Sequence, residues 1–146
     1  MTPDPQWLAI AQQAAQRHQL DEDLVCAVIE QESGWDTYAI RYEPAFRARY
    51  VAPLGLPPTE EIARSISWGL MQVMGQVARE FGYTGGMAAL CAPLNGIETG
   101  AKVLNHKVAC AHGNVREALL AWNGGANPKY PDEVFARTAN YQHSAT

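Results

Sequence analysis

Apolar side chains recur three and four residues apart along most of this 146-residue chain. This spacing places them on one face of an α-helix, whereas a half-buried strand needs strict alternation, which no segment shows over a convincing length. The sequence therefore predicts an all-α fold in one domain over residues 1–146, with at most a minor β-ribbon hidden in residues 36–56. The clearest helical stripe follows Pro93 and consists of Leu94, Ile97, Ala101, Leu104 and Val108.

Capping residues and helix breakers predict where the helices begin and end. Acidic residues from Asp21 favour a helix start, and Gly34 favours its end. Asn114, three residues before Glu117, is typical of a helix N-terminus. We expect helices over residues 5–17, 21–34, 70–81, 94–108, 115–122 and 131–141, a short helix from Thr59, and an irregular segment over residues 35–58.

Glu32 lies on the apolar face of its predicted helix. At 100° per residue, Leu24, Val25, Val28 and Ile29 occupy one arc, and Glu32 falls in the middle of it. Burial and the negative end of the helix dipole both disfavour a charged carboxylate, so the pKa of Glu32 should be raised. A raised pKa suits a general acid that works near neutral pH. The alternative is a glutamate at the edge of the core that reaches water or pairs with an arginine such as Arg41 or Arg64.

Charge and hydropathy exclude two classes of partner. A net charge of −4, from 11 basic and 15 acidic residues, provides no broad basic face for nucleic acid. No apolar run approaches the ~18 residues of a membrane span, and the N-terminus lacks the basic-then-apolar order of a signal peptide. We therefore expect no membrane insertion, and synthesis in the cytoplasm without a signal peptide.

The cysteines and histidines predict neither a disulfide scaffold nor a metal centre. Three cysteines are an odd number, and we expect Cys26, Cys91 and Cys110 to be reduced and buried. The four histidines show no ligand spacing with them. We predict no metal and no cofactor.

Four motifs follow one another along the chain: ES at residues 32–33, GLMQ at residues 69–72, AWNGG at residues 121–125, and Tyr130. Together they resemble the soluble lytic transglycosylase (SLT) family of the lysozyme-like superfamily, over roughly residues 20–141. The resemblance implies a helical fold of goose-lysozyme or SLT type with a substrate groove. It also implies cleavage of the β-1,4 bond between N-acetylmuramic acid and N-acetylglucosamine in peptidoglycan, with 1,6-anhydromuramoyl products.

The resemblance assigns a role to each matching residue. Glu32 corresponds to the catalytic glutamate, which acts as an acid and then as a base, so that no second carboxylate is required. The late tyrosine Tyr130 lies near that carboxylate in the family, with Tyr141 as the fallback. Residues expected to bind substrate or shape its groove are Ser33, Ser65, Met71, Gln72, Trp122 and Asn123, with Gly69 allowing the backbone close to the sugar.

Two features depart from compact relatives. Trp122 replaces the commoner tyrosine and offers an indole N–H in place of a hydroxyl. About 36 residues separate Glu32 from Gly69, which indicates an insertion over residues 42–64. Aromatic faces pack against sugar rings, so we also expect Trp35 and Trp68 to line the groove.

Two alternatives stay open from the sequence. A goose-type lysozyme would use water and a second carboxylate, for which Glu43 is the candidate, and the two carboxyl groups would then lie ~6.5–9.5 Å apart. A wall-binding or virion module would keep the groove without the chemistry. We expect a monomer that acts on cell-wall glycan strands, as a phage-type endolysin or a virion- or secretion-associated enzyme.

Overall fold

The computed structural model describes residues 3–142, and the fold in this part is mainly helical, as the periodicity predicts. Three strands form one small sheet: β1 (Ile40–Tyr42), β2 (Ile66–Trp68) and β3 (Val73–Met74). Three short helical turns are η1 (Arg47–Val51), η2 (Ala52–Leu54) and η3 (Met87–Cys91). The α-helices are α1 (Pro5–Arg17), α2 (Glu22–Ser33), α3 (Pro44–Phe46), α4 (Pro58–Arg64), α5 (Gly75–Glu80), α6 (Pro93–Cys110), α7 (Val115–Trp122) and α8 (Tyr130–Thr138).

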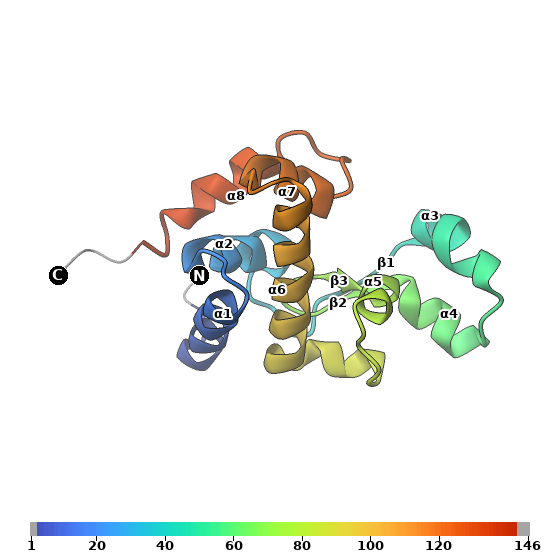
Figure 1. Cartoon of the computed structure of the whole chain (residues 1–146). Coiled ribbons are helices and arrows are strands. Elements are labelled where there is room, and N and C mark those ends of the chain that lie inside the picture. Colours follow the sequence, from blue (N-terminus) through green and yellow to red (C-terminus); the bar gives the residue numbers. More distant parts are fainter. Residues whose placement is uncertain (1–2, 143–146) are drawn as a thin grey trace.

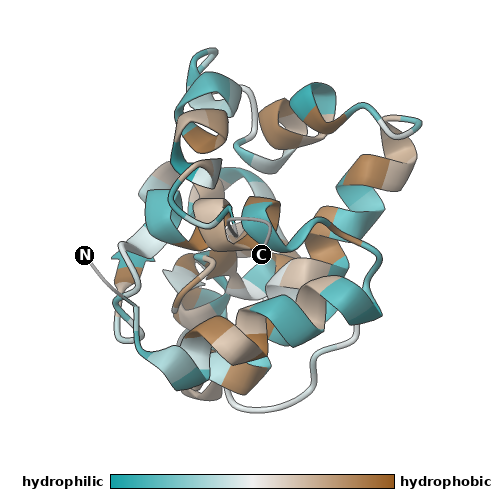
Figure 2. Ribbon diagram, turned by 90° about the vertical axis from the view of Figure 1, so that its left-hand side faces the viewer, coloured by the Kyte–Doolittle hydropathy of each residue, from teal (hydrophilic) through white to brown (hydrophobic). Residues whose placement is uncertain are grey.

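Helix α6 runs through the middle of the helical part, where it packs against α1 and α7, while α2 packs against α1 and α8 (Figure 1). Each long helix carries both hydrophobic and hydrophilic residues along its length (Figure 2), which is the composition of an amphipathic helix. The stripe of α6 is buried as predicted at Ile97, Ala101 and Leu104, but Leu94 in the first turn is 58% exposed. The apolar arc of α2 is fully inside the core.

The helix ends follow the predicted caps closely. The side chain of Asp21 accepts hydrogen bonds from the backbone N–H groups of Asp23 and Leu24, and Asn114 accepts one from Glu117. Helix α2 ends at Gly34 in the left-handed region, with φ 59°. The last helix is shorter than predicted, because α8 ends at Thr138.

The sheet is larger than the predicted ribbon, and two of its three strands lie outside residues 36–56. Strand β1 falls within residues 36–56, but it pairs antiparallel with β2, where Ile40 is opposite Trp68. Strand β3 pairs with the other edge of β2, so the order is β1-β2-β3. Strands of two or three residues are too short to show alternation, and pairing between distant segments stabilises them instead.

The predicted helix over residues 70–81 is wrong in its first half. Gly69 and Gln72 both have left-handed backbones, with φ of 72° and 52°, so the chain turns there instead of continuing as a helix. Strand β3 follows, and α5 begins only at Gly75. Leu70 and Met71 are buried, so their apolar character reflects a buried turn and not the face of a helix.

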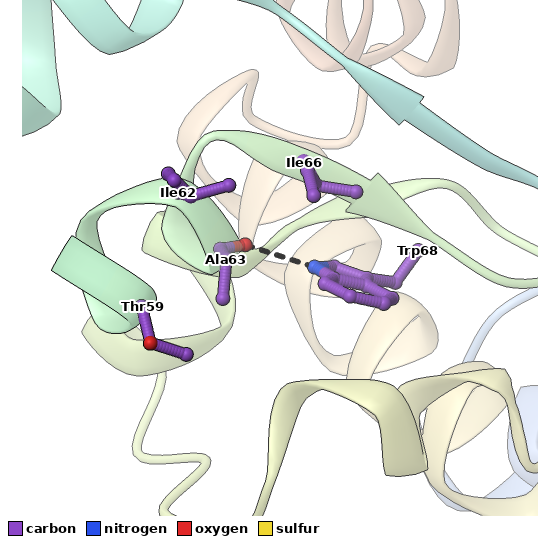
Figure 3. A pocket seen from close by; sticks show the side chains of 5 residues that line it. All are labelled: Thr59, Ile62, Ala63, Ile66 and Trp68. Atoms are coloured by element: carbon purple, nitrogen blue, oxygen red, sulfur yellow. Dashed lines mark hydrogen bonds between the residues drawn. The ribbon is translucent and has the colours of Figure 1, made fainter.

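Residues 42–64 form a lobe of short helical turns ending in α4, and the sheet lies between this lobe and helices α2 and α8 (Figure 1). Between α4 and β2 lies an open apolar hollow of about 280 Å³, lined by Thr59, Ile62, Ala63, Ile66 and Trp68 (Figure 3). The indole N–H of Trp68 donates to the carbonyl of Ala63 at 2.9 Å. Half-buried Trp68 thus packs against the lobe.

The cysteines are all unpaired, but only one is buried. Cys26 lies in the core, Cys91 is half-buried and Cys110 is exposed at the end of α6, so the prediction of three buried thiols is wrong for two of them. Burial is the largest cause that raises the pKa of the Cys26 thiol to about 12.

Candidate active site

Glu32 is the second-last residue of α2, and the local sequence turns the chain away directly after Ser33. Gly34 and Trp35 are both left-handed, with φ of 59° and 66°. The Ser33 hydroxyl lies 2.7 Å from the Leu70 carbonyl and 3.1 Å from that of Ile29. The end of α2 is therefore fixed against the turn that contains the GLMQ motif, and Ser33 serves this contact.

The two oxygens of the Glu32 carboxyl group have different surroundings. Oε2 accepts a short hydrogen bond from the phenol of Tyr130 and a longer one, of 3.4 Å, from the indole N–H of Trp122. Oε1 has no hydrogen-bond partner among the described residues, and it is not enclosed by them. One oxygen is thus held by hydrogen bonds within the protein, and the other has no partner within residues 3–142 and is not fully buried.

The pKa of Glu32 is raised, mainly because burial disfavours the charged carboxylate. The hydrogen bonds from Tyr130 and Trp122 and the positive charge of Arg41 oppose this shift without cancelling it. Arg41, one of the two arginines named as possible partners of Glu32, lies in strand β1. Its charge lowers the pKa of Glu32, but its ion pair is with Glu43.

Tyr130, at the first position of α8, is 3% exposed. Burial, followed by the neighbouring charge of Glu32, raises the pKa of its phenol, so the side chain stays a neutral donor. The fallback Tyr141 lies elsewhere: it donates to Glu30 at 2.8 Å and accepts from the indole of Trp35 at 2.8 Å. The structure therefore brings Tyr130, and not Tyr141, to the Glu32 carboxyl.

Trp122 and Asn123 at the end of α7 complete this group. The indole of Trp122 supplies a donor where the commoner tyrosine would supply a hydroxyl. The side-chain nitrogen Nδ2 of Asn123 is buried without a hydrogen-bond partner in the described part of the chain. An unpaired buried donor is costly, and such groups in native proteins are often explained by a ligand or a water molecule.

Two of the predicted groove residues do not present their side chains as expected. Met71 is fully buried, and its side chain packs directly against the backbone of Gly100 in α6. Ser65 is also fully buried and donates to the carbonyl of Glu61 at 2.7 Å. Direct contact of either side chain with a substrate does not fit this burial.

Gln72 is half-buried and uses its amide inside the protein. Its Nε2 donates to the carbonyls of Ala39 and Gly69 at 2.8 and 2.9 Å, and its Oε1 accepts from Ser67 at 2.8 Å. A β-carbon at Gly69 would lie 2.5 Å from the carbonyl oxygen of Leu90, so this glycine allows an approach of η3. The GLMQ motif thus contacts Ala39 just before β1, Ser67 on β2, and η3.

Glu43 and Trp35 also differ from expectation. The Glu43 carboxylate pairs with Arg41 at 3.0 Å in the loop that follows β1, and it is not among the groups that hold Glu32. Trp35 is 4% exposed and belongs to the core, so its ring face does not line a groove. No group of three or more potential metal ligands lies within residues 3–142.

The sequence did not predict a role for Glu133, which contacts a residue near each member of the Glu32–Tyr130 pair in the chain. Glu133 on α8 contacts Gln31 on α2 and Asn127 in the loop before α8. The available signal was its position three residues after Tyr130, which places both on neighbouring positions of one helix.

A mainly helical fold with a small sheet and a desolvated glutamate at a helix end defines a lysozyme-like protein. The chain matches the family described as "Transglycosylase SLT domain" over residues 9–143, and it belongs to that family. This places it among peptidoglycan lytic transglycosylases that act on the cell wall. No solved structure matches the chain. In the described part, none of the helices has the length and apolar character needed to span a bilayer.

Proposed function

We propose that this chain cleaves the β-1,4 bond between N-acetylmuramic acid and N-acetylglucosamine without water, with Glu32 as the single acid and base. The observation that carries the proposal is the asymmetry of the Glu32 carboxyl group. Two donors occupy Oε2, so the acidic proton of the neutral form belongs on the open Oε1. That oxygen is the one that reaches a glycosidic bond.

The first step uses Glu32 as a general acid. Its Oε1 proton moves to the glycosidic oxygen, and the bond between that oxygen and C1 of the muramoyl residue breaks with its electrons on the departing oxygen. The carbonyl of the substrate's own acetamide stabilises the positive charge at C1. Hydrogen bonds from Tyr130 and Trp122 stabilise the carboxylate that remains.

The second step uses the same group as a base. The Glu32 carboxylate takes the proton of the muramoyl 6-hydroxyl, and O6 forms a bond to C1, which closes the 1,6-anhydro ring and restores the acid. No water is consumed. Asn123 follows Trp122 directly and is half-buried, and in this proposal it contributes to substrate binding beside the acid.

Digestion of purified sacculi tests this reaction. We expect the wild-type protein to release muropeptides with 1,6-anhydro ends by mass spectrometry, and Glu32→Gln to keep the fold while losing activity by about 100-fold or more. Glu43→Gln serves as the matched control and should retain activity, because Glu43 pairs with Arg41 and not with Glu32.

Other outcomes would assign another function. Reducing ends, together with a loss of activity in Glu43→Gln, would identify a goose-type hydrolase that uses Glu43 as its second carboxylate. Undiminished lysis by Glu32→Gln would refute the role of Glu32. Binding of wild-type protein to sacculi without release of products would identify a wall-binding module.

A further inference from the structure

The side chain of Glu133 joins two segments that flank the candidate active site. Its Oε2 accepts a hydrogen bond of 2.8 Å from Nε2 of Gln31 on α2. Its two oxygens also lie 3.2 and 3.3 Å from Nδ2 of Asn127, in the loop between α7 and α8. Glu133 is half-buried, so these contacts are partly shielded from water.

The orientation of Asn127 is fixed by the backbone around it. Its side-chain Oδ1 accepts from the N–H of Lys129 at 3.0 Å, which leaves Nδ2 directed at Glu133. The carbonyl of Asn127 accepts from the N–H of Tyr130 at 3.1 Å. Asn127 therefore sets both the course of the loop and the first residue of α8.

Gln31 and Asn127, the two residues that contact the Glu133 carboxylate, lie close to the two partners of the hydrogen bond between Tyr130 and Glu32. Gln31 directly precedes Glu32 on α2, and Asn127 holds the backbone of Tyr130. We propose that Glu133 is a positioning residue that holds the Tyr130 phenol on Oε2 of Glu32 by tying α2 to the loop before α8. The importance of this contact for catalysis rests on the proposed function, whereas its effect on Glu32 itself does not.

Several charged and polar groups face Glu32 and Glu133, and a test of the proposal must separate their effects. Glu32 is faced by Tyr130 from α8, Trp122 from α7 and Arg41 from β1. The Glu133 carboxylate is faced by the amides of Gln31 and Asn127, and its charge also acts on the Tyr130 phenol. Arg137 donates to the backbone carbonyl of Glu133 at 3.3 Å and not to its carboxylate.

Two substitutions of Glu133 distinguish a positioning role from an effect of its negative charge. Glu133→Ala removes both the carboxylate charge and the acceptors. Glu133→Gln removes only the charge. The Oε1 atom of Gln31 is buried without a partner in the described part of the chain, so the Gln31 amide can rotate and let Oε1 accept a hydrogen bond from the amide introduced at position 133. The new amide oxygen still accepts from Asn127.

The main measurement is the pKa of the Glu32 carboxyl group by ¹³C NMR, which requires no turnover. Because the hydrogen bond from Tyr130 lowers this pKa, we expect it to rise in Glu133→Ala and to stay near the wild-type value in Glu133→Gln. In the Tyr130→Phe background, Glu133→Ala should cause no further rise, since the bond through which it acts is already absent. With sacculi, kcat should fall about tenfold in Glu133→Ala, with KM within about twofold.

Several results would overturn the proposal. An unchanged Glu32 pKa in a folded but less stable Glu133→Ala would show a merely structural role, and equal shifts in the alanine and glutamine variants would show a charge effect. If Glu133→Ala does not fold, Asn127→Ala removes the same contact from the loop side and must raise the pKa of Glu32. If the wild-type protein is itself inert on sacculi but Glu133→Ala still raises the pKa of Glu32, the proposed function is refuted and the positioning role is left intact.

Discussion

At the scale of single residues, the surroundings of Glu32 combine two opposite influences. Burial raises the pKa of its carboxyl group, while the donors on Oε2 limit that rise. A carboxyl group that acts first as an acid and then as a base needs both burial and donors, since a buried carboxylate without donors would be poorly stabilised after it gives up its proton. The two donors come from the neighbouring ends of α7 and α8.

Tyr130→Phe should raise the pKa of Glu32, because the hydrogen bond that is removed stabilises the charged form. The alkaline limb of the pH–activity profile, where Glu32 loses its proton, should then move to higher pH, and kcat should fall about tenfold. The profile is measured by release of soluble muropeptides. Tyr141→Phe is the matched control, because Tyr141 contacts Glu30 and Trp35. An unchanged limb in Tyr130→Phe would contradict the assignment.

Met71→Ala tests whether this residue belongs to the core or to the groove. Since Met71 is fully buried against Gly100, its truncation should lower the free energy of unfolding by about 2–5 kcal/mol. Leu94→Ala, at an exposed position on α6, should change it by about 0.5 kcal/mol or less. Urea denaturation gives both values. A Met71→Ala protein of normal stability with a raised KM would instead support the groove assignment.

At the scale of elements, the insertion lobe is tied to the rest of the molecule by ion pairs around Glu60. Its carboxylate contacts Arg64 on α4 and Arg79 on α5, both at 2.8 Å. The hydrogen bond from Arg79, followed by that from Arg64, lowers the pKa of Glu60 to about 2. Glu60 thus connects α4 to α5, next to the sheet.

Glu60→Gln should lower the Tm, and the loss should depend on pH. A carboxyl group whose pKa is depressed by folding stabilises the folded state above its unfolded pKa of 4.5 and loses this effect as the pH falls toward about 2. The difference in Tm between wild type and variant should therefore be full at pH 6 and close to zero near pH 2, as followed by circular dichroism. Asp132→Asn removes an exposed pair with Arg116 and should cost little at any pH. A difference that does not depend on pH would contradict this account.

The sequence predicted helices better than strands for a physical reason. Helix ends depend on local contacts, such as the Asp21 and Asn114 caps, and these are visible in neighbouring residues. The sheet depends on pairing between β1 and β2, more than twenty residues apart. The turn at Gln72 depends on a hydrogen bond from its amide to the distant backbone of Ala39. The apolar stripe over residues 70–81 carries no sign of that contact and therefore predicts a helix start.

The candidate site was predictable where chemistry alone marks a residue. Glu32 stood out because a carboxylate on an apolar helix face is unusual, and its partners Tyr130 and Trp122 followed from the motifs. Ser65 and Met71 are fully buried, and a motif does not distinguish a side chain that lines a groove from one that supports it. Glu133 was missed because its role depends on contacts across the fold.

At the scale of the whole molecule, the candidate site joins parts that are far apart in the chain. Helix α2 supplies Glu32, the end of α7 supplies Trp122, and α8 supplies Tyr130. Behind them, Trp35, Tyr141 and Glu30 form a second chain of hydrogen bonds between the exit of α2 and the segment after α8. Tyr130 at the start of α8 and Tyr141 after its end are therefore both hydrogen-bonded to residues of α2.

The hydrogen bond between Tyr130 and Glu32 spans 98 positions of sequence. During synthesis, a ribosome that has made Glu32 must still add 98 residues before its donor exists. A nascent or truncated product that stops before α8 would carry Glu32 without its phenol partner. Until Tyr130 has been made, the candidate site thus lacks one of the two donors to Glu32.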